Sequence, residues 1–233
     1  IIIIYIIISI IKLNIYYSKI MKILKYNNIL PNDLNDKNSV DEIFDEKIKK
    51  KYMDNQINFC NSNDLFLDID MENKIKKVNA HLNGISFNMF VYKENDVVSK
   101  FISSSGNWEA KSTNDLIKCL DYYSQKKKLS KNEITIIDIG ANVGWYSFFF
   151  AKAGYELISF EVSHMNGYIL KKNFCLNKEV NITIINKGIG LNNEKCLLHH
   201  PSWNKGNAVI LCGENKNIAN KNQNLTEEEV RYP

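Results

Sequence analysis

The sequence has little arginine, and this absence bears on its partners. Arg231 is the single arginine among 30 basic residues, whereas Ile and Asn each occur 33 times in 233 residues. Because Ile, Asn and Lys all have A/T-rich codons, we interpret the pI of 8.6 as a result of genome composition. Proteins that bind nucleic acid use arginine forks for phosphates and base edges. A nucleic-acid partner is therefore not expected.

Cysteine motifs are also lacking. The five cysteines are odd in number, and no two of them form a C-x-x-C. Their spacing therefore predicts neither a disulfide framework nor a zinc knuckle. Metal-ligand residue types gather at Cys196, His199, His200 and Cys212 without a standard spacing. We predict buried thiols and exposed strand-end histidines there, and no metal.

No apolar run is long enough to span a bilayer. The longest, IIIIYIIISII, ends before Lys12, and a span needs about 20 residues. Residues 1–20 are interpreted either as translated non-coding sequence or, if Lys12 is tolerated, as a weak membrane anchor. Without that anchor, we expect a cytoplasmic protein with no membrane partner.

Hydrophobic residues make up 45% of the chain, so it can bury a core and wholesale disorder is excluded. Residues 21–75 are rich in Asn, Asp and Lys, which predicts a polar linker with one weak helix near 40–52. Residues 76–130 form the next predicted unit, a hairpin followed by a helix. Residues 131–233 are predicted to form the main domain.

Alternating apolar residues predict the hairpin, with its turn at Asn83-Gly84. Ser112 or Thr113 is then expected to cap a helix that runs to a cluster of three lysines at 126–128.

The most informative stretch follows. Ile134–Ile139 is a continuous apolar run rich in β-branched residues, typical of a parallel strand buried on both faces. Gly140 and Gly144 permit a tight turn, and residues 146–152 are apolar enough for a helix that packs on a sheet. A second predicted strand then ends at Glu161. This βαβ unit predicts an α/β, Rossmann-like sheet.

The ligand of such a unit lies across the carboxyl ends of the strands, where an acid can bind ribose hydroxyls. A dinucleotide site would have G-x-G-x-x-G, but Asn142 stands at its middle glycine. Asp138 at the strand end would repel a pyrophosphate and suits a cationic ligand that carries an amino acid. S-adenosylmethionine fits this description better than a nicotinamide cofactor does.

These residues resemble the FkbM family of S-adenosylmethionine-dependent methyltransferases. The resemblance covers roughly residues 80–215, and its motifs are Gly106-Asn-Trp108-Glu109, Asp138-Ile-Gly140-Ala-Asn142-Val-Gly144, Phe160-Glu161, Leu170-Lys-Lys-Asn173-Phe-Cys-Leu-Asn177 and Ile182-Thr-Ile-Ile-Asn186-Lys-Gly-Ile-Gly190. It implies a class I methyltransferase sheet. It also implies methyl transfer to an oxygen of a small-molecule, glycan or lipid acceptor.

The resemblance further implies a set of cofactor-binding residues: Asp138, Gly140, Ala141, Asn142, Gly144, Glu161, Val162 and Asn186. The loop after Asp138 is expected under the methionine part of the cofactor, with Asp138 near the ammonium group. Glu161 is expected at the ribose, and Val162 and Asn186 beside the adenine. No general base is assigned, because no His or carboxylate can be placed in that role.

The family's later Asp-x-Glu-Gly element has no counterpart after Asn186. The sheet is therefore expected to be incomplete at the C-terminal end. An alternative hypothesis follows from this absence, namely a cofactor-binding remnant or interaction module without transferase activity.

Overall fold

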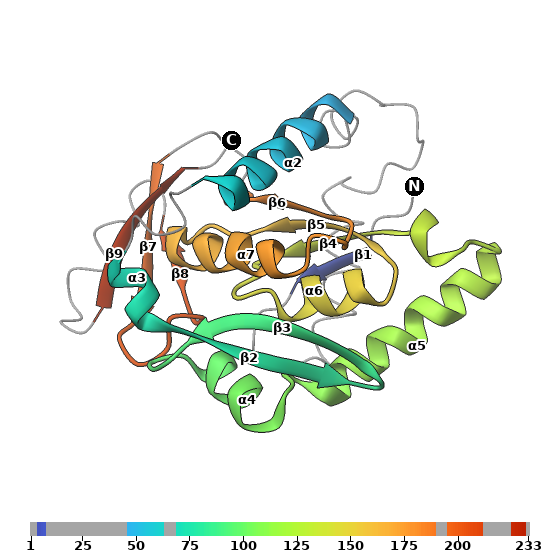
Figure 1. Ribbon diagram of the computed structural model, residues 1–233, viewed down its shortest axis with the longest axis horizontal. Helices are drawn as coiled ribbons and strands as arrows, with labels where there is room; N and C mark the ends of the chain where they lie inside the picture. The colour runs from blue at the N-terminus through green and yellow to red at the C-terminus, as the bar shows by residue number, and fades with distance from the viewer. Residues whose placement is uncertain (1–3, 8–45, 63–68, 190–194, 212–224, 232–233) are drawn as a thin grey trace.

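The computed structural model describes residues 4–7, 46–62, 69–189, 195–211 and 225–231. A four-stranded sheet in the order β1-β4-β5-β6 lies at its centre (Figure 1). The strands are β1 (Ile4–Ile7), β4 (Thr135–Ile139), β5 (Glu156–Phe160) and β6 (Ile182–Ile185). Every neighbouring pair is parallel. The predicted α/β class is therefore confirmed, and the parallel sheet is compatible with a Rossmann-like arrangement.

The N-terminal strand was not expected. Residues 1–20 had no predicted place in the fold, whereas Ile4–Ile7 pairs with β4 from Ile4 opposite Ile136 to Ile7 opposite Ile139. A run of isoleucine has high strand propensity, and it occupies the edge of β4 opposite to β5. Among the described residues, no helix is both long and apolar enough to cross a membrane.

Two helices connect the parallel strands, as predicted, and pack on the same face of the sheet (Figure 1). They are α6 (Trp145–Lys152) and α7 (His164–Leu176). Ser163 caps α7, its side chain accepting a hydrogen bond from the Asn166 amide, and Gly154 follows the end of α6 at φ 99°. Residues alternate along β4, so Ile136 joins the core under these helices while Ile137 joins a smaller cluster on the opposite face.

The predicted hairpin is confirmed. It consists of β2 (Ile75–Leu82) and β3 (Ile85–Tyr92), joined at Asn83 (φ 52°) and Gly84 (φ 78°), whose positive φ angles suit a type I′ turn. The hairpin covers the outer side of α6 and α7 (Figure 1). Asn173 of α7 holds it there, because its side-chain amide accepts from the Phe90 N–H at 2.5 Å and donates to the Phe90 carbonyl at 3.1 Å.

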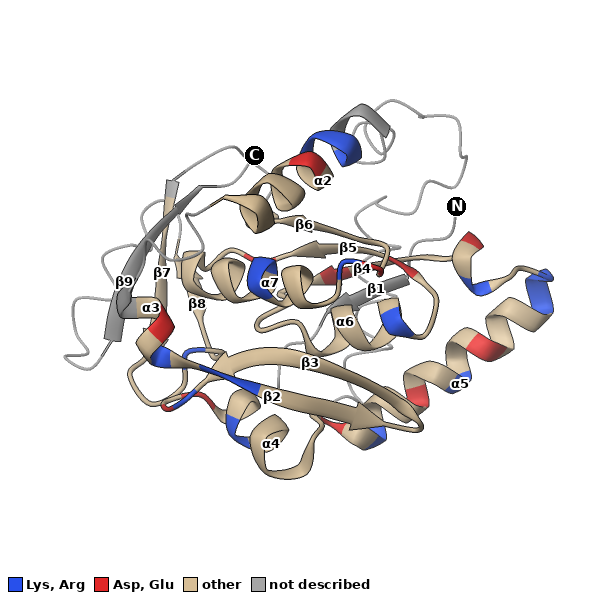
Figure 2. Cartoon of the chain, viewed as in Figure 1, with Lys and Arg blue, Asp and Glu red and all other residues tan. Residues whose placement is uncertain are grey.

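The hairpin leads into α4 (Val97–Ser105), which the sequence pattern did not predict, and then into α5 (Ala110–Lys127). The predicted cap of α5 is wrong, since the helix begins two residues before Ser112. Thr113 is buried instead, and its hydroxyl accepts a hydrogen bond from the Trp145 indole at 3.1 Å. Charged residues recur along the length of α5, as expected of a solvated face (Figure 2). A 3₁₀ turn, η2 (Lys131–Glu133), leads from α5 towards β4.

Part of the predicted linker is structured. The weak helix predicted near 40–52 corresponds to α2 (Glu46–Asn61), and α3 (Ile69–Lys74) was not predicted. The Gln56 side chain donates to the Ile182 carbonyl at 3.1 Å and accepts from the Ile184 N–H at 2.6 Å. These bonds join α2 to β6, and at 1% exposure Gln56 is excluded from solvent.

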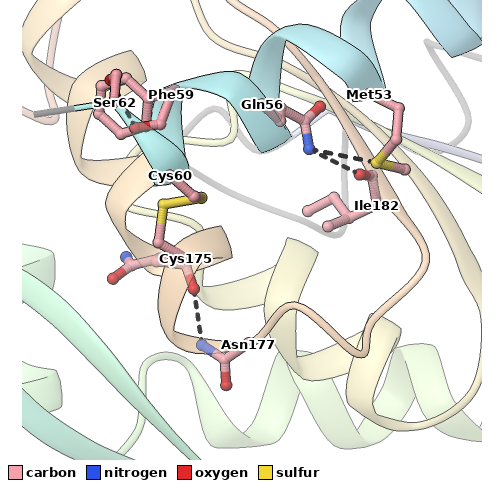
Figure 3. Close-up of a disulfide and its surroundings, with 9 residues drawn as sticks. Met53, Gln56, Phe59, Cys60, Ser62, Cys175, Asn177 and Ile182 are labelled. Atoms are coloured by element: carbon pink, nitrogen blue, oxygen red, sulfur yellow. Dashed lines mark hydrogen bonds between the residues drawn. A yellow bond between two sulfur atoms is a disulfide. The ribbon is translucent and has the colours of Figure 1, made fainter. Parts of the chain in front are cut away.

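A disulfide joins Cys60 of α2 to Cys175 of α7 (Figure 3). The spacing of the cysteines predicted no disulfide framework, and this prediction is wrong for Cys60 and Cys175, because the fold brings together cysteines 115 positions apart. Closing a loop of that length stabilises a chain by about 4–5 kcal/mol in the chain-entropy model. Cys119 is an exposed free thiol, and Cys196 is also disulfide-bonded, with its partner outside the described residues.

The remaining strands form an antiparallel sheet in the order β8-β7-β9. They are β7 (Lys195–Pro201), β8 (Val209–Leu211) and β9 (Leu225–Arg231). His199 is only 3% exposed, so the prediction of an exposed histidine is wrong at this position. Among the described residues, no His, Cys, Asp and Glu side chains are grouped so as to hold a metal ion. Cys212, the last member of the group considered from the sequence, lies outside the described residues.

Candidate functional site

Asp138 lies near the carboxyl end of β4, on the side that faces α6. One carboxylate oxygen, Oδ2, accepts a hydrogen bond from Ser147 Oγ at 2.5 Å, and Ser147 Oγ lies 2.8 Å from Ser159 Oγ. The other oxygen, Oδ1, is buried and has no hydrogen-bond partner within the described part of the chain. Burial raises the pKa of Asp138 to about 6, although the bond from Ser147 acts in the opposite direction. Asp138 therefore carries one buried oxygen that can still accept a hydrogen bond.

The loop after Asp138 is a tight turn around glycines. Gly140 (φ 81°), Asn142 (φ 53°) and Gly144 (φ 96°) all have left-handed backbone. At Gly144 a Cβ atom would lie 2.7 Å from a side-chain carbon of Leu170, so the close packing of α6 on α7 requires glycine there. At Gly140 a Cβ would meet nothing within 4 Å. The backbone at Gly140 is therefore open to the approach of a ligand.

Glu161 holds this loop from the neighbouring strand end. Its Oε2 accepts from the Asn142 N–H at 2.7 Å, and its Oε1 accepts from the Ser163 N–H at 2.9 Å. Burial raises the pKa of Glu161 to about 7. The backbone bonds from Ser163 and Asn142 oppose this rise, and the charge of Asp138 adds to it. The carboxylate that the resemblance assigns to a ribose is thus bonded to the loop backbone in this structure.

A cavity of about 50 Å³ lies against the loop. Of the eight predicted cofactor-binding residues, four line it: Asp138, Gly140, Ala141 and Asn142. The side-chain oxygen of Asn142 is, like Asp138 Oδ1, a buried acceptor with no partner among the described residues. Two unsatisfied acceptors thus belong to residues of one small cavity. A cavity of this volume admits only the end of a larger ligand, since sites that hold a whole small molecule measure about 300–1,000 Å³.

The other four predicted residues do not line this cavity. Gly144 precedes α6, and Glu161 is bonded to the loop from the side. Asn186 fastens the end of β5, because its Nδ2 donates to the Glu161 carbonyl at 2.7 Å and to the Ser163 carbonyl at 3.1 Å. Val162 packs against Cys196 and Leu198 of β7. The structure thus gives Val162 and Asn186 packing and hydrogen-bonding roles away from the cavity.

Several cavity residues were not among the predicted site residues. The Tyr146 hydroxyl donates to Glu109 at 2.8 Å, and Trp108 forms part of the wall. Trp108 and Glu109 belong to the Gly106-Asn-Trp108-Glu109 motif of the family resemblance, so the sequence carried a signal for this wall. The sequence carried no such signal for Val98 and Gly206, which also line the cavity, because their segments contain no motif.

Gly206 closes the cavity from the segment that follows β7. Its N–H donates to Asp96 Oδ2 at 2.9 Å, and a Cβ at this position would lie 2.4 Å from the Asn142 side-chain nitrogen. The segment therefore lies directly on the glycine loop.

No family model matches the chain, and no curated protein or solved structure matches it. The class of protein that fold and site define is an α/β protein with a parallel sheet and an anionic, glycine-lined cavity at the carboxyl end of a strand. The arrangement can receive a positively charged group at Asp138.

Proposed function

We propose that the chain is an S-adenosylmethionine-dependent methyltransferase, of the FkbM type, that methylates an oxygen of a small-molecule, glycan or lipid acceptor. The observation that carries this proposal is the Oδ1 of Asp138, a buried acceptor beside a glycine loop that has no hydrogen-bond partner among the described residues. Leaving a buried acceptor unsatisfied costs about 1–3 kcal/mol. The ammonium group of a methionine moiety would satisfy this oxygen, and the nearby amide oxygen of Asn142 could share it.

The same observation argues against a dinucleotide. A pyrophosphate needs N–H donors and positive charge at the start of a helix. The cavity here is lined instead by a carboxylate and by Asn142, whose amide oxygen has no partner in the described part of the chain. Anionic phosphate groups would be repelled at this position. A cationic ligand is therefore favoured over a nicotinamide cofactor.

The residues of the cavity would have different roles in binding the cofactor. Asp138 and Asn142 would hold the amino-acid part, and the open backbone at Gly140 would let the ligand approach. The bound cofactor supplies the electrophilic methyl group. The protein's contribution is to orient donor and acceptor, an effect that can be worth about 7–11 kcal/mol. Burial, followed by the hydrogen bond to Glu109, raises the pKa of Tyr146, so its hydroxyl stays protonated and is not a general base.

A cofactor-binding remnant without transferase activity is the second candidate. Two observations favour it: the cavity holds only about 50 Å³, and the Glu161 carboxylate is already bonded to the Asn142 and Ser163 amides. The cavity is smaller than a nucleoside needs. The bonded Glu161 carboxylate has less capacity left to accept hydrogen bonds from ribose hydroxyls.

Calorimetry with S-adenosylmethionine and S-adenosylhomocysteine tests the proposal. We expect both to bind, and Asp138→Asn to weaken binding at least tenfold, while Asp115→Asn on the exposed face of α5 has no effect. Because ionised Asp138 is the binding form and its pKa is about 6, affinity should fall about tenfold between pH 7 and pH 5, and this dependence should be lost in Asp138→Asn.

Three outcomes separate the candidates. A folded protein that binds neither compound contradicts the methyltransferase proposal. Binding without methylation of any acceptor supports the remnant. Binding of NADH in place of the sulfonium compounds would favour an oxidoreductase.

We also propose that the chain folds in an oxidising compartment, in contrast to the cytoplasmic expectation. The Cys60–Cys175 disulfide and the disulfide-bonded Cys196 support this, because structural disulfides are rare in the cytosol. Cells of the native source are lysed in N-ethylmaleimide and the digest is analysed by mass spectrometry without reduction. We expect a Cys60–Cys175 linked peptide together with alkylated Cys119, which serves as the internal control. Alkylation of both Cys60 and Cys175 would overturn the proposal.

A further inference from the structure

A second and larger hollow shares the segment Asp96–Val98 with the cavity. Val98 lines the small cavity, whereas Asp96 and Val97 line the hollow. The hollow has a volume of about 620 Å³, which falls in the range of sites for small molecules. Two sites that share one stretch of chain can hold two ligands whose reacting ends are close together.

The lining of the hollow carries an excess of positive charge. Lys76 comes from β2, Lys93 follows β3, and Lys100 lies on α4. None of the three is in an ion pair with a described residue. Figure 2 shows basic positions on β2 and α4 at this end of the hairpin, with acidic residues in the loop between them.

The acidic residues of the hollow offset part of this charge, since three lysines against Glu94 and Asp96 leave a formal charge of +1. The Asp96 carboxylate is 5% exposed and is occupied by two backbone bonds, from the Ser99 N–H at 2.7 Å and the Gly206 N–H at 2.9 Å. Glu94 is exposed and is the only other acid of the lining. Nearby, Lys205 lies over the Tyr92 ring at 4.6 Å and adds a further positive group. Burial, followed by the charge of Lys74, lowers the pKa of Lys205.

The hollow also has an aromatic wall and hydroxyl groups. Trp203 lines it and is 62% exposed, so most of a large flat apolar side chain faces solvent. Ser103, Ser104 and Asn95 add small polar groups. A flat ring beside cations, hydroxyls and an amide matches a ligand with an apolar ring face, many hydroxyls and a negative charge. Nucleobases would also stack on tryptophan, but the site has no arginine for a phosphate fork.

We propose that this hollow binds an acidic carbohydrate, with the sugar ring on Trp203 and its carboxylate among Lys76, Lys93 and Lys100. The proposal rests on the proposed function in one respect, since the sugar would be the methyl acceptor. Because Val97 of the hollow and Val98 of the small cavity are consecutive residues, a hydroxyl of the sugar would lie towards the small cavity. Binding itself does not depend on the methyltransferase activity.

Titration of the full chain with two acidic probes tests the proposal: hyaluronan tetrasaccharide and trigalacturonate. The neutral comparison is chitotetraose, which lacks the carboxylates. We expect at least one acidic probe to bind at least tenfold more tightly than chitotetraose, and its binding to weaken as salt is raised. Equal affinity for acidic and neutral sugars, or no binding of either acidic probe, would overturn the inference.

Substitutions locate the binding. Lys93→Gln and Lys100→Gln together should remove the preference for acidic sugars, and Trp203→Ala should weaken binding of the acidic probe at least fivefold. All three side chains are exposed, so the variants should fold. The controls are Lys118→Gln and Tyr122→Ala, which are exposed on α5. An effect of the controls as large as that of the hollow variants would contradict the assignment.

Cofactor binding is measured separately on the same samples. If S-adenosylmethionine binds but neither acidic sugar does, this inference fails and the proposed function stands. If an acidic sugar binds at Trp203 and S-adenosylmethionine does not bind, the hollow is a sugar site and the proposed function fails.

Discussion

Asp138 and Glu161 are two buried carboxylates at the ends of neighbouring strands. Asp138 is 1% exposed and Glu161 is 5% exposed, and burial is the largest cause of the raised pKa of each. A buried carboxylate is costly to ionise, and neither side chain has a basic hydrogen-bond partner within the described ranges of the chain. Such a pair destabilises the fold at neutral pH, which is typical of residues retained for binding rather than for stability.

The pH dependence of stability tests this interpretation. The folded pKa of Asp138 is about 6 against an ordinary value of 3.8, so the folded state holds a proton that the unfolded state has lost. Stability therefore falls as pH rises from about 4 to 6. We expect Asp138→Asn to raise the free energy of unfolding at pH 7.5 by about 2–3 kcal/mol and to have little effect at pH 3.5.

Urea unfolding at a series of pH values measures this difference. Asp115→Asn is the matched control, because Asp115 is an exposed carboxylate on α5. If Asp138→Asn and Asp115→Asn change the free energy of unfolding equally at pH 7.5, burial of the ionised Asp138 carboxylate does not destabilise the fold.

At the scale of elements, side-chain amides repeatedly bond to the backbone of strands. Gln56 of α2 bonds to β6, and Asn173 of α7 bonds to β3 through both its oxygen and its nitrogen. Asn177 adds a bond to the Asn88 carbonyl of the same hairpin at 2.9 Å. These amides supply the donor and acceptor that a neighbouring strand would otherwise provide.

We expect Gln56→Leu to destabilise the protein by about 2–4 kcal/mol, because it leaves the Ile182 carbonyl and the Ile184 N–H buried without partners. Equilibrium unfolding measures the loss, and hydrogen exchange at the Ile184 amide should become faster. Gln125→Leu, at an exposed position on α5, is the control. A Gln56→Leu protein as stable as this control would show that α2 does not support β6 in solution.

The elements that could be predicted from the sequence share one property: their signals lie within a short stretch. Asn83-Gly84 specifies its own turn, Ser163 caps its own helix, and the apolar run before Asp138 is the strand itself. The glycine loop that follows Asp138 could be predicted for the same reason.

What could not be predicted depends on distant parts of the chain. Cys60 meets Cys175 because α2 packs on α7, and nothing near either cysteine indicates this. The start of α5 was misplaced because Thr113 bonds to the Trp145 indole instead of capping its own helix. Gly206 lies against Asn142 of the glycine loop, and its N–H bonds to Asp96, 110 positions away.

For the whole molecule, the span of the Cys60–Cys175 disulfide has a consequence during synthesis. Chains grow at about 5–20 residues per second, so Cys60 leaves the ribosome roughly 6–23 s before its partner over the 115 intervening positions. Cys119 is the first cysteine synthesised after Cys60. In the finished protein it remains an exposed free thiol. Cys119 is thus the earliest competitor for Cys60, and the correct bond requires either delayed oxidation or later exchange of a wrong pair.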